Sequence, residues 1–277
     1  MASNDEFVWT ADSRWLGGFA NLTAKENRRW WKSRRWLVQT LVWFVITNGL
    51  LFFILWVVPK IAAQQGVAEE QAVLRDLDLT GITVFLSTIG LATAIGVSII
   101  GQDALINEKH NGTAAWVMSK PASRSAFVLA KIAGNLAGIL VTMVIIQGAA
   151  AYLQIWLATG TAYPLVPYFG ALGMVILNLL FFLTLTLMLG ALSSSRGLVI
   201  GLPLFLILGY PILSQFGAWI IEIMPWNLTI SLGASPALAL SLVRGQPLQT
   251  VMPLIMTGLW CILFTGVALW RFNREEF

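Results

Sequence analysis

Six runs of apolar residues dominate the sequence, and shorter polar segments separate them. A helix needs about 20 consecutive apolar residues to cross a bilayer, so runs of this length predict membrane-spanning helices. The third run is longer than a bilayer requires, and we expect it to be tilted or to project beyond the membrane. The fold class is therefore an all-α integral membrane protein with six spans, at about residues 36–58, 79–100, 127–159, 169–192, 198–212 and 251–270.

The segment before the first span has a different pattern. Residues 1–13 are a polar tail, whereas between Arg14 and Arg35 apolar residues recur at helical spacing among tryptophans and cations. This predicts an interfacial helix on the membrane surface, although Glu26 interrupts its apolar stripe. A positively charged stop without a defined helix is the alternative. The division is thus 1–35 and 36–277, and the expected lipid anchors are Trp30, Trp31, Arg34, Arg35 and Trp36.

The connection between the second and third spans, residues 101–131, is called the polar stretch here. No other interior connection carries so many charged residues. Hydrocarbon cannot satisfy such groups, so the polar stretch must lie in water or against another protein. An ordinary cytoplasmic loop is one interpretation, and a docking surface for a partner is the other.

The order of residues within the polar stretch predicts two short helices. Asp103 is expected to cap the first, which runs through Glu108 and is broken by Gly112. The second begins at Thr113 and ends at Pro121. Two short helices folded back between spans favour docking over a slack connection.

Prolines and one serine predict several other boundaries. Ser123 is placed to cap the third long helix, which we expect to begin near Phe127. Pro59 is expected to end the first span, and Pro203 and Pro211 to interrupt the fifth. The stretch from 213 to 250, which contains Glu222, is too irregular to cross the membrane. It is predicted to form re-entrant or interfacial half-helices at the outer surface.

The distribution of cations predicts the orientation. With both termini in the cytoplasm, 14 of the 17 Lys and Arg residues are cytoplasmic: seven before the first span, four in the polar stretch, one at Arg196 and two at the end. Lys60, Arg75 and Arg244 are the outer ones. The positive-inside rule therefore places the polar stretch in the cytoplasm of a protein in the inner membrane.

Composition agrees with this interpretation. Hydrophobic residues make up 57% of the chain and charged ones 11%, against about 25% in a soluble domain. The net charge of +4 does not indicate nucleic-acid binding, because the cations gather at the predicted membrane edges. The single cysteine, Cys261, lies in an apolar run and excludes an intrachain disulfide framework.

The polar side chains within the predicted spans are mostly uncharged. With Lys131 counted in the polar stretch, the spans hold no charged residue or histidine, which argues against a gradient-driven carrier. Candidate residues of a translocation path are Thr83, Ser87, Thr88 and Tyr210. The sequence shows no catalytic triad, metal-ligand spacing or phosphate-binding loop, so no cofactor or metal is expected on this chain. ATP hydrolysis would need another chain.

The segment NEKHNGTAAWVMSKPASRSAFVLAK resembles the connection between spans two and three of ABC-2 type transporter permeases. That family shows a Glu, then Gly-Thr, an apolar run, Ser-(Lys)-Pro, Ser-Arg and a Phe before a Lys. The matching residues are Glu108, Gly112, Thr113, Pro121, Arg124, Phe127 and Lys131. The basic entry helix and the six spans are similar along essentially the whole chain.

The resemblance implies a type V, ABCG-like exporter in which this chain is non-catalytic. Two permease chains, identical or different, would pair, and a partner ATPase would bind ATP and Mg²⁺. Spans two and five would line the path. The polar stretch would be the coupling helix, with Asp103, Glu108, Gly112, Thr113, Trp116, Pro121 and Arg124 as the candidate ATPase-coupling residues. The alternative is a membrane anchor or mechanical transmitter, whose segment 213–250 would bind an extracytoplasmic partner without solute passage.

Overall fold

The computed structural model describes residues 15–111, 122–233 and 235–274, without the side chains of 67–69 and 107–110. Every regular element in these ranges is helical, and one isolated bridge joins Leu232 and Ser235. The α-helices are α1 (Phe19–Trp31), α2 (Arg35–Trp43), α3 (Gly49–Phe52), α4 (Val58–Gln65), α5 (Val67–Arg75), α6 (Leu77–His110), α8 (Arg124–Ile139), α9 (Ile146–Thr159), α10 (Leu165–Leu192), α11 (Arg196–Leu213), α12 (Ala218–Ile223), α13 (Leu238–Val243) and α14 (Met252–Asn273).

Six of the described helices are long and apolar enough to cross a membrane, as predicted. They occupy Arg35–Gln65, Leu77–Ile106, Arg124–Thr159, Leu165–Leu192, Arg196–Phe216 and Met252–Asn273. Short π-helical segments at Phe44–Asn48, Phe53–Val57 and Leu140–Ile145 join helices within the first and third of these spans. The chain is a multi-pass, all-helical membrane protein.

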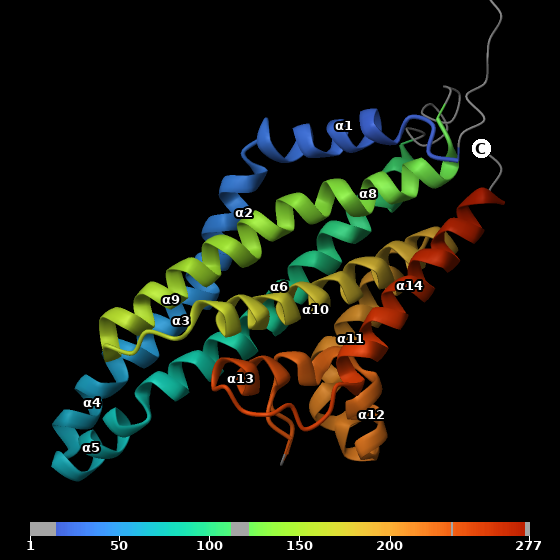
Figure 1. Ribbon diagram of the computed structural model, residues 1–277. Coiled ribbons are helices and arrows are strands. Elements are labelled where there is room, and N and C mark those ends of the chain that lie inside the picture. The colour runs from blue at the N-terminus through green and yellow to red at the C-terminus, as the bar shows by residue number, and fades with distance from the viewer. Residues whose placement is uncertain (1–14, 112–121, 234, 275–277) are drawn as a thin grey trace, which may run out of the picture.

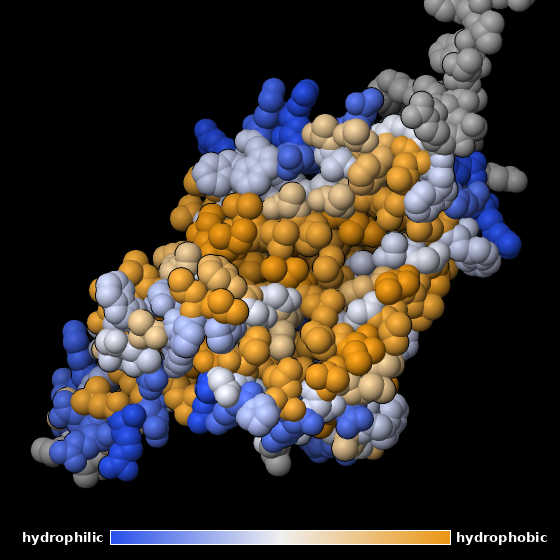
Figure 2. Space-filling model, in the orientation of Figure 1, coloured by the Kyte–Doolittle hydropathy of each residue, from blue (hydrophilic) through white to orange (hydrophobic). Residues whose placement is uncertain are grey.

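The spans form one bundle around α10, which is the most buried of the six (Figure 1). Helices α6, α13 and α14 pack against α10, and α1 packs along α8. We call the end of the bundle with α1, the start of α8 and the end of α14 the basic end. The opposite end, with α5, α12 and α13, is the far end. Figure 2 shows a hydrophobic band between hydrophilic groups at these two ends.

Three predicted proline boundaries are wrong. The first span continues through Pro59 to Gln65, and Pro59 directly follows the π-helical segment Phe53–Val57 within it. Pro203 and Pro211 lie inside an unbroken α11. Prolines are tolerated within membrane helices. Between these two prolines, the Leu206 carbonyl accepts a hydrogen bond from the Trp226 indole of the folded-back stretch.

The second span also ends later than predicted. Asp103 lies inside α6 and does not cap a separate helix, since α6 runs without a break from Leu77 to His110. Beyond the predicted membrane edge, α6 still has a packing partner: Leu105 and Ile106 are buried near Gly190 of α10. Burial of these apolar residues keeps the helix continuous.

The stretch between α11 and α14 folds back into the bundle, as predicted, but through short helical turns and loop. Trp226, Leu228, Ile230 and Leu232 are buried. The Thr229 side chain lies against Gly90 of α6, where a Cβ atom would approach its oxygen to 2.1 Å. Gly90 is thirteen residues, about 20 Å, from the start of α6, so the stretch reaches deep between the helices.

Candidate functional site: the α6–α8 connection and its contacts

The two helices that flank the polar stretch are longer than a membrane requires. The 34 residues of α6 span about 51 Å, and the 36 residues from Arg124 to Thr159 span about 54 Å. The hydrocarbon core is only about 30 Å thick, so both helices can cross it and continue beyond it. Glu108 lies in the last turn of α6. The other predicted coupling residues between the helices, Gly112, Thr113, Trp116 and Pro121, lie outside the described residues.

The start of α8 is held by the segment that precedes α1. Ser123 caps α8, as predicted, because its hydroxyl accepts a hydrogen bond from the Ala126 amide at 3.0 Å. That hydroxyl donates to the Trp15 carbonyl at 2.6 Å, and the Ser123 amide donates to the Gly17 carbonyl at 3.0 Å. The helix begins at Arg124, three residues before the predicted start.

The same helix end is also joined to the end of α14. Arg124 donates from Nη1 to the Asn273 carbonyl at 2.7 Å, which places a cation at the negative end of a helix dipole. The rings of Phe127 and Phe272 stack with centroids 5.1 Å apart. Arg124, a predicted ATPase-coupling residue, thus has an intramolecular partner, and its role toward an ATPase stays a prediction.

A buried ion pair lies between α1 and α8. Lys131 Nζ is 2.6 Å from Glu26 Oε1, and the two side chains are 1% and 6% exposed. The prediction that the third span carries no charge is wrong, because Lys131 lies inside α8. The pair also explains why Glu26 interrupts the apolar stripe of α1. Removing one member would leave an uncompensated buried charge, at a cost of about 3–5 kcal/mol.

Two glycines of α8 allow α1 to approach closely. A Cβ at Gly134 would lie 2.4 Å from the Glu26 Cβ, and one at Gly138 would lie 2.2 Å from the Trp30 ring. The Trp30 indole donates to Asn135 Oδ1 at 3.2 Å. Small residues four apart are typical of tightly packed membrane helices. Glu26, Trp30, Lys131, Gly134, Asn135 and Gly138 together are called the α1–α8 contact.

The predicted lipid anchors divide into two groups. Trp30 is 1% exposed in the α1–α8 contact, so its prediction as a headgroup anchor is wrong. Arg35 is half-buried, with its guanidinium 5.0 Å from the centre of the Trp30 ring. Trp31, Arg34 and Trp36 are exposed. A basic face of α1 lies away from α8, and its exposed cations are Lys25, Arg28, Arg29 and Lys32. Lipid contact by this face stays a prediction.

Two of the four candidate path residues contact the folded-back stretch. Ser87 on α6 donates to the Thr229 carbonyl at 3.5 Å, and the Tyr210 ring of α11 lies 6.4 Å from that of Trp226. Thr83 instead donates to the carbonyl four residues earlier in its own helix. Thr88 is half-buried. The structure therefore brings Ser87 and Tyr210 against the same segment, at Thr229 and Trp226, and their role in translocation stays a prediction.

A second polar contact joins the first and third spans near the middle of the bundle. Asn48 donates to Gln147 Oε1 at 2.8 Å, and Gln154 donates to Asn48 Oδ1 at 2.9 Å. Gln147 also donates to the Thr40 carbonyl. Side-chain hydrogen bonds link residues between Ser123 and Gln154 to the N-terminal segment. In each of these bonds the two partners are 99 to 108 residues apart in the sequence, so the separation stays nearly constant along both segments. The two segments therefore run side by side in the same direction.

The α1–α8 contact was missed although the sequence carries a signal for it. Lys131, Gly134, Asn135 and Gly138 have the spacing of one helical face, and GNLAG fits the motif of two glycines four apart. Glu26 and Trp30 have the same spacing on α1. Within the residues described, no three His, Cys, Asp or Glu side chains gather as metal ligands.

Comparison with known proteins covers nearly the whole chain. The family described as "ABC-2 family transporter protein" matches residues 20–277. No curated protein matches the sequence. The matched residues include all six spans, the α1–α8 contact and the polar stretch.

Proposed function

This chain belongs to the ABC-2 transporter family as the transmembrane component of an ABC transporter, and we propose that it is one permease subunit driven by a separate ATPase chain. A second permease chain, identical or similar, completes the translocation path. The ATPase binds ATP and Mg²⁺, and this chain is non-catalytic. The cargo moves outward, as the family resemblance implies.

The observation that carries this proposal is the length and continuity of α6 and of the helix from Arg124 to Thr159. Each is long enough to extend past the bilayer core, and the end of α6 and the start of α8, which the polar stretch joins in sequence, lie at the basic end. A displacement of that connection acts on both helices together, and through Arg124 and Glu26 on α14 and α1. Rigid-body movement of packed helices is an established way to transmit such a change.

The basic end is the cytoplasmic end in this proposal. The exposed cations of α1 lie there, together with Arg271 and Arg274 at the end of α14. Cations at one end of a helical bundle favour its cytoplasmic location. The polar stretch then meets the ATPase: Glu108 makes a polar contact with it or braces the connection, and Gly112 permits the turn. The other proposed ATPase-coupling residues are Asp103, Thr113, Trp116, Pro121 and Arg124.

The path is assigned to the side of the bundle between α6 and α11. Helix α11 is among the least buried spans, and Phe205 and Leu208 expose their side chains there. A second permease chain packed on this face would enclose Ser87, Tyr210 and the folded-back stretch between the two chains. The exposed face of α11 is thus the proposed contact between permease chains.

Co-purification and a distance measurement test the proposal. The tagged chain, isolated from its native membrane, is expected to carry an ATPase subunit. A spin label at Leu208→Cys, in a Cys261→Ser background, should report a second label close by when two copies of this chain pair, because Leu208 lies on the proposed contact between permease chains. ATP with vanadate should change that distance. Isolation without any ATPase would overturn the proposal.

Two substitutions in the connection test coupling. Glu108→Ala and Gly112→Leu should leave membrane insertion and ATP hydrolysis intact and abolish the ATP-dependent distance change. Glu222→Ala, the same truncation of an exposed glutamate at the far end, is the matched control and should behave as wild type. A full ATP response in both connection variants would contradict the assigned role of the polar stretch.

A force-transmitting subunit without solute passage is the second candidate. Phe216 and Trp219 are strongly exposed on the folded-back stretch at the far end, where an extracytoplasmic partner could bind. A bound far-end partner, with an ATP response but no solute movement in sealed vesicles, would favour this alternative over a permease.

A further inference from the structure

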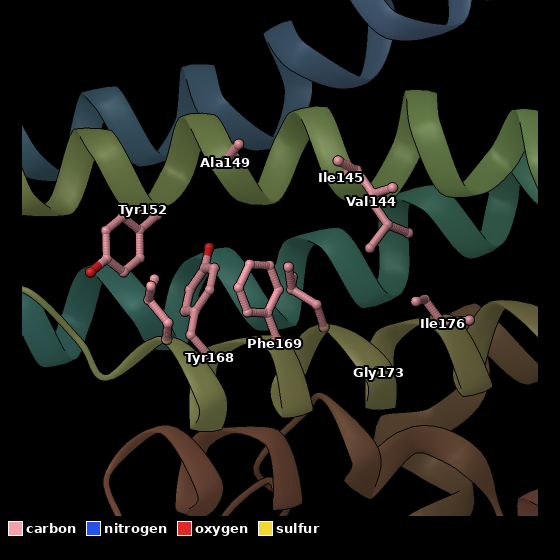
Figure 3. A pocket seen from close by; sticks show the side chains of 10 residues that line it. Val144, Ile145, Ala149, Tyr152, Tyr168, Phe169, Gly173 and Ile176 are labelled. Atoms are coloured by element: carbon pink, nitrogen blue, oxygen red, sulfur yellow. The ribbon is translucent and has the colours of Figure 1, made fainter.

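An apolar groove lies between α9 and α10, away from every contact described above. Its cavity has a volume of about 430 Å³. One wall comes from α9 and the turn before it, including Val144, Ile145 and Ala149. The other comes from the first half of α10, and Figure 3 shows the rings of Tyr168 and Phe169 in the gap. Both helices pack on α6, so the groove is closed behind and open at the side.

The lining side chains of the groove offer no free hydrogen-bond donor to an occupant. Its two hydroxyls already have partners, because Tyr168 donates to the Gly148 carbonyl at 2.7 Å and Tyr152 donates to the Tyr163 carbonyl at 2.9 Å. The remaining lining side chains are hydrocarbon. A polar or charged ligand would lose its hydration here and gain at most the two phenolic oxygens as acceptors, whereas an alkyl chain has no such loss. The chemistry of the groove selects an apolar occupant.

The opening of the groove faces the side of the bundle. Ile145, Leu165 and Phe169 on its rim are 55%, 56% and 63% exposed. These residues belong to two membrane-spanning helices, so the medium at the rim is lipid. The rim is continuous with the lipid-facing surface, and the groove is therefore accessible to the bilayer without movement of any helix.

The length of the groove matches one leaflet. Along α10 it runs from Leu165 to Ile176, twelve residues whose ends are about 17 Å apart. Half of a hydrocarbon core about 30 Å thick is about 15 Å. Tyr152 and Tyr168 lie toward the end of the groove near the start of α10, and tyrosines are enriched at the membrane–water interface. The groove thus begins at one interface and ends near the middle of the bilayer.

We propose that this groove is a binding site for one acyl chain of a membrane lipid in the leaflet at the far end. The glycerol and headgroup lie beyond Tyr152, and the chain extends past Phe169 to Ile176. Gly173 leaves the wall open, since a Cβ there would meet no neighbouring atom within 4 Å. The inference requires only that the chain spans a membrane, and it stands apart from the assignment of ATPase, export or pairing.

Photolabelling tests the proposal on the full chain. The purified protein is placed in vesicles of phosphatidylcholine and phosphatidylglycerol with a trace of phosphatidylcholine that carries a diazirine at mid-chain. After irradiation, mass spectrometry should find label on 144–152 and 165–176 at about fivefold the level on the exposed face of α14. A chain held in the groove contacts walls on both sides, whereas lipid meets the exposed face of α14 from one side only, so the groove should collect more label.

The matched variants are Gly173→Leu and Gly266→Leu. Both glycines lie on lipid-accessible helix faces with no atom within 4 Å of an added Cβ, but only Gly173 lines the groove. Gly173→Leu should lower groove labelling about fivefold, because the new side chain and an acyl chain cannot share the space. Gly266→Leu should leave it unchanged.

Three results would overturn the proposal. Equal labelling of the groove and α14 would make the groove ordinary lipid-facing surface. Unchanged labelling in Gly173→Leu would place the label elsewhere. Efficient disulfide formation between copies carrying Phe169→Cys in a Cys261→Ser background would show that a second chain fills the groove.

Discussion

The long helical segment from Arg124 to Thr159 makes two very different contacts along its length. In its first half, α8 holds α1 so closely that Gly134 and Gly138 have no room for a Cβ atom, and an ion pair is buried beside them. In its second half, α9 faces α10 across an open apolar groove in which Gly173 has free space. Glycine therefore serves opposite purposes in the two contacts.

This difference suggests a division of roles within one helix. The α1–α8 contact combines charge, a hydrogen bond and close backbone approach, and each of these depends on a fixed geometry. The groove contact depends only on apolar surface and can tolerate small displacements. A displacement of the polar stretch would therefore move α8 and α1 together as one rigid unit. The contact between α9 and α10 would instead allow the two helices to shift relative to each other.

The largest expected effect comes from reversing one charge of the ion pair. Glu26→Lys would place two cations in the buried α1–α8 contact and should cost at least the ~3–5 kcal/mol that follows from breaking a buried pair. We expect a strong loss of folded protein, measured by thermal unfolding in detergent. Lys131→Glu should behave similarly.

The double variant Glu26→Lys with Lys131→Glu is the control for this prediction. It restores opposite charges across the contact and should recover a large part of the lost stability. If the double variant is no more stable than the single ones, the pair does not hold α1 to α8 through its charges.

A smaller effect should separate the two kinds of glycine. Gly138→Leu inserts a side chain into the space of the Trp30 ring and should destabilise by about 1–3 kcal/mol or more, because overpacking forces backbone shifts. Gly173→Leu enters open space and should change the unfolding temperature little. Equal effects in the two variants would contradict the contrast between a closed contact and an open groove.

The smallest effect should come from single hydrogen bonds in the two contacts. Trp30→Phe removes the donor to Asn135, and Tyr168→Phe removes the donor to the Gly148 carbonyl. Tyr168→Phe should cost about 1 kcal/mol, the typical net value of one hydrogen bond, as measured by thermal unfolding. Trp30→Phe should cost more, because it also removes part of a fully buried ring. Equal losses in the two variants would contradict the packing of the indole in the α1–α8 contact.

Hydropathy was sufficient to predict six spans because an apolar run of sufficient length indicates a membrane helix without reference to the rest of the chain. It could not place Pro59, Pro203 or Pro211 correctly, since prolines are tolerated within membrane helices. The continuation of α6 past Asp103 depends likewise on packing against the end of α10. Local rules for helix ends fail where tertiary contacts extend the helix.

The main feature of the site that escaped prediction is a pairing across the sequence. In the sequence, Glu26 interrupts the apolar stripe of an amphipathic helix, and Lys131 is one of several cations in the polar stretch. Each is explained only by the other, 105 residues away. The residue type and the neighbours of Trp30 predict a membrane anchor. In the structure, however, Gly138 on α8 provides the space that buries the Trp30 ring.

That separation of 105 residues has a consequence for how the protein is made. At a synthesis rate of 5–20 residues per second, Glu26 leaves the ribosome roughly 5–20 s before Lys131 does. During that interval the carboxylate lacks Lys131, its partner in the buried ion pair, and must remain hydrated, so α1 cannot settle into its final place. The N-terminal segment docks only after the third span emerges, which makes late arrival of α8 the step that completes assembly of the entry helix.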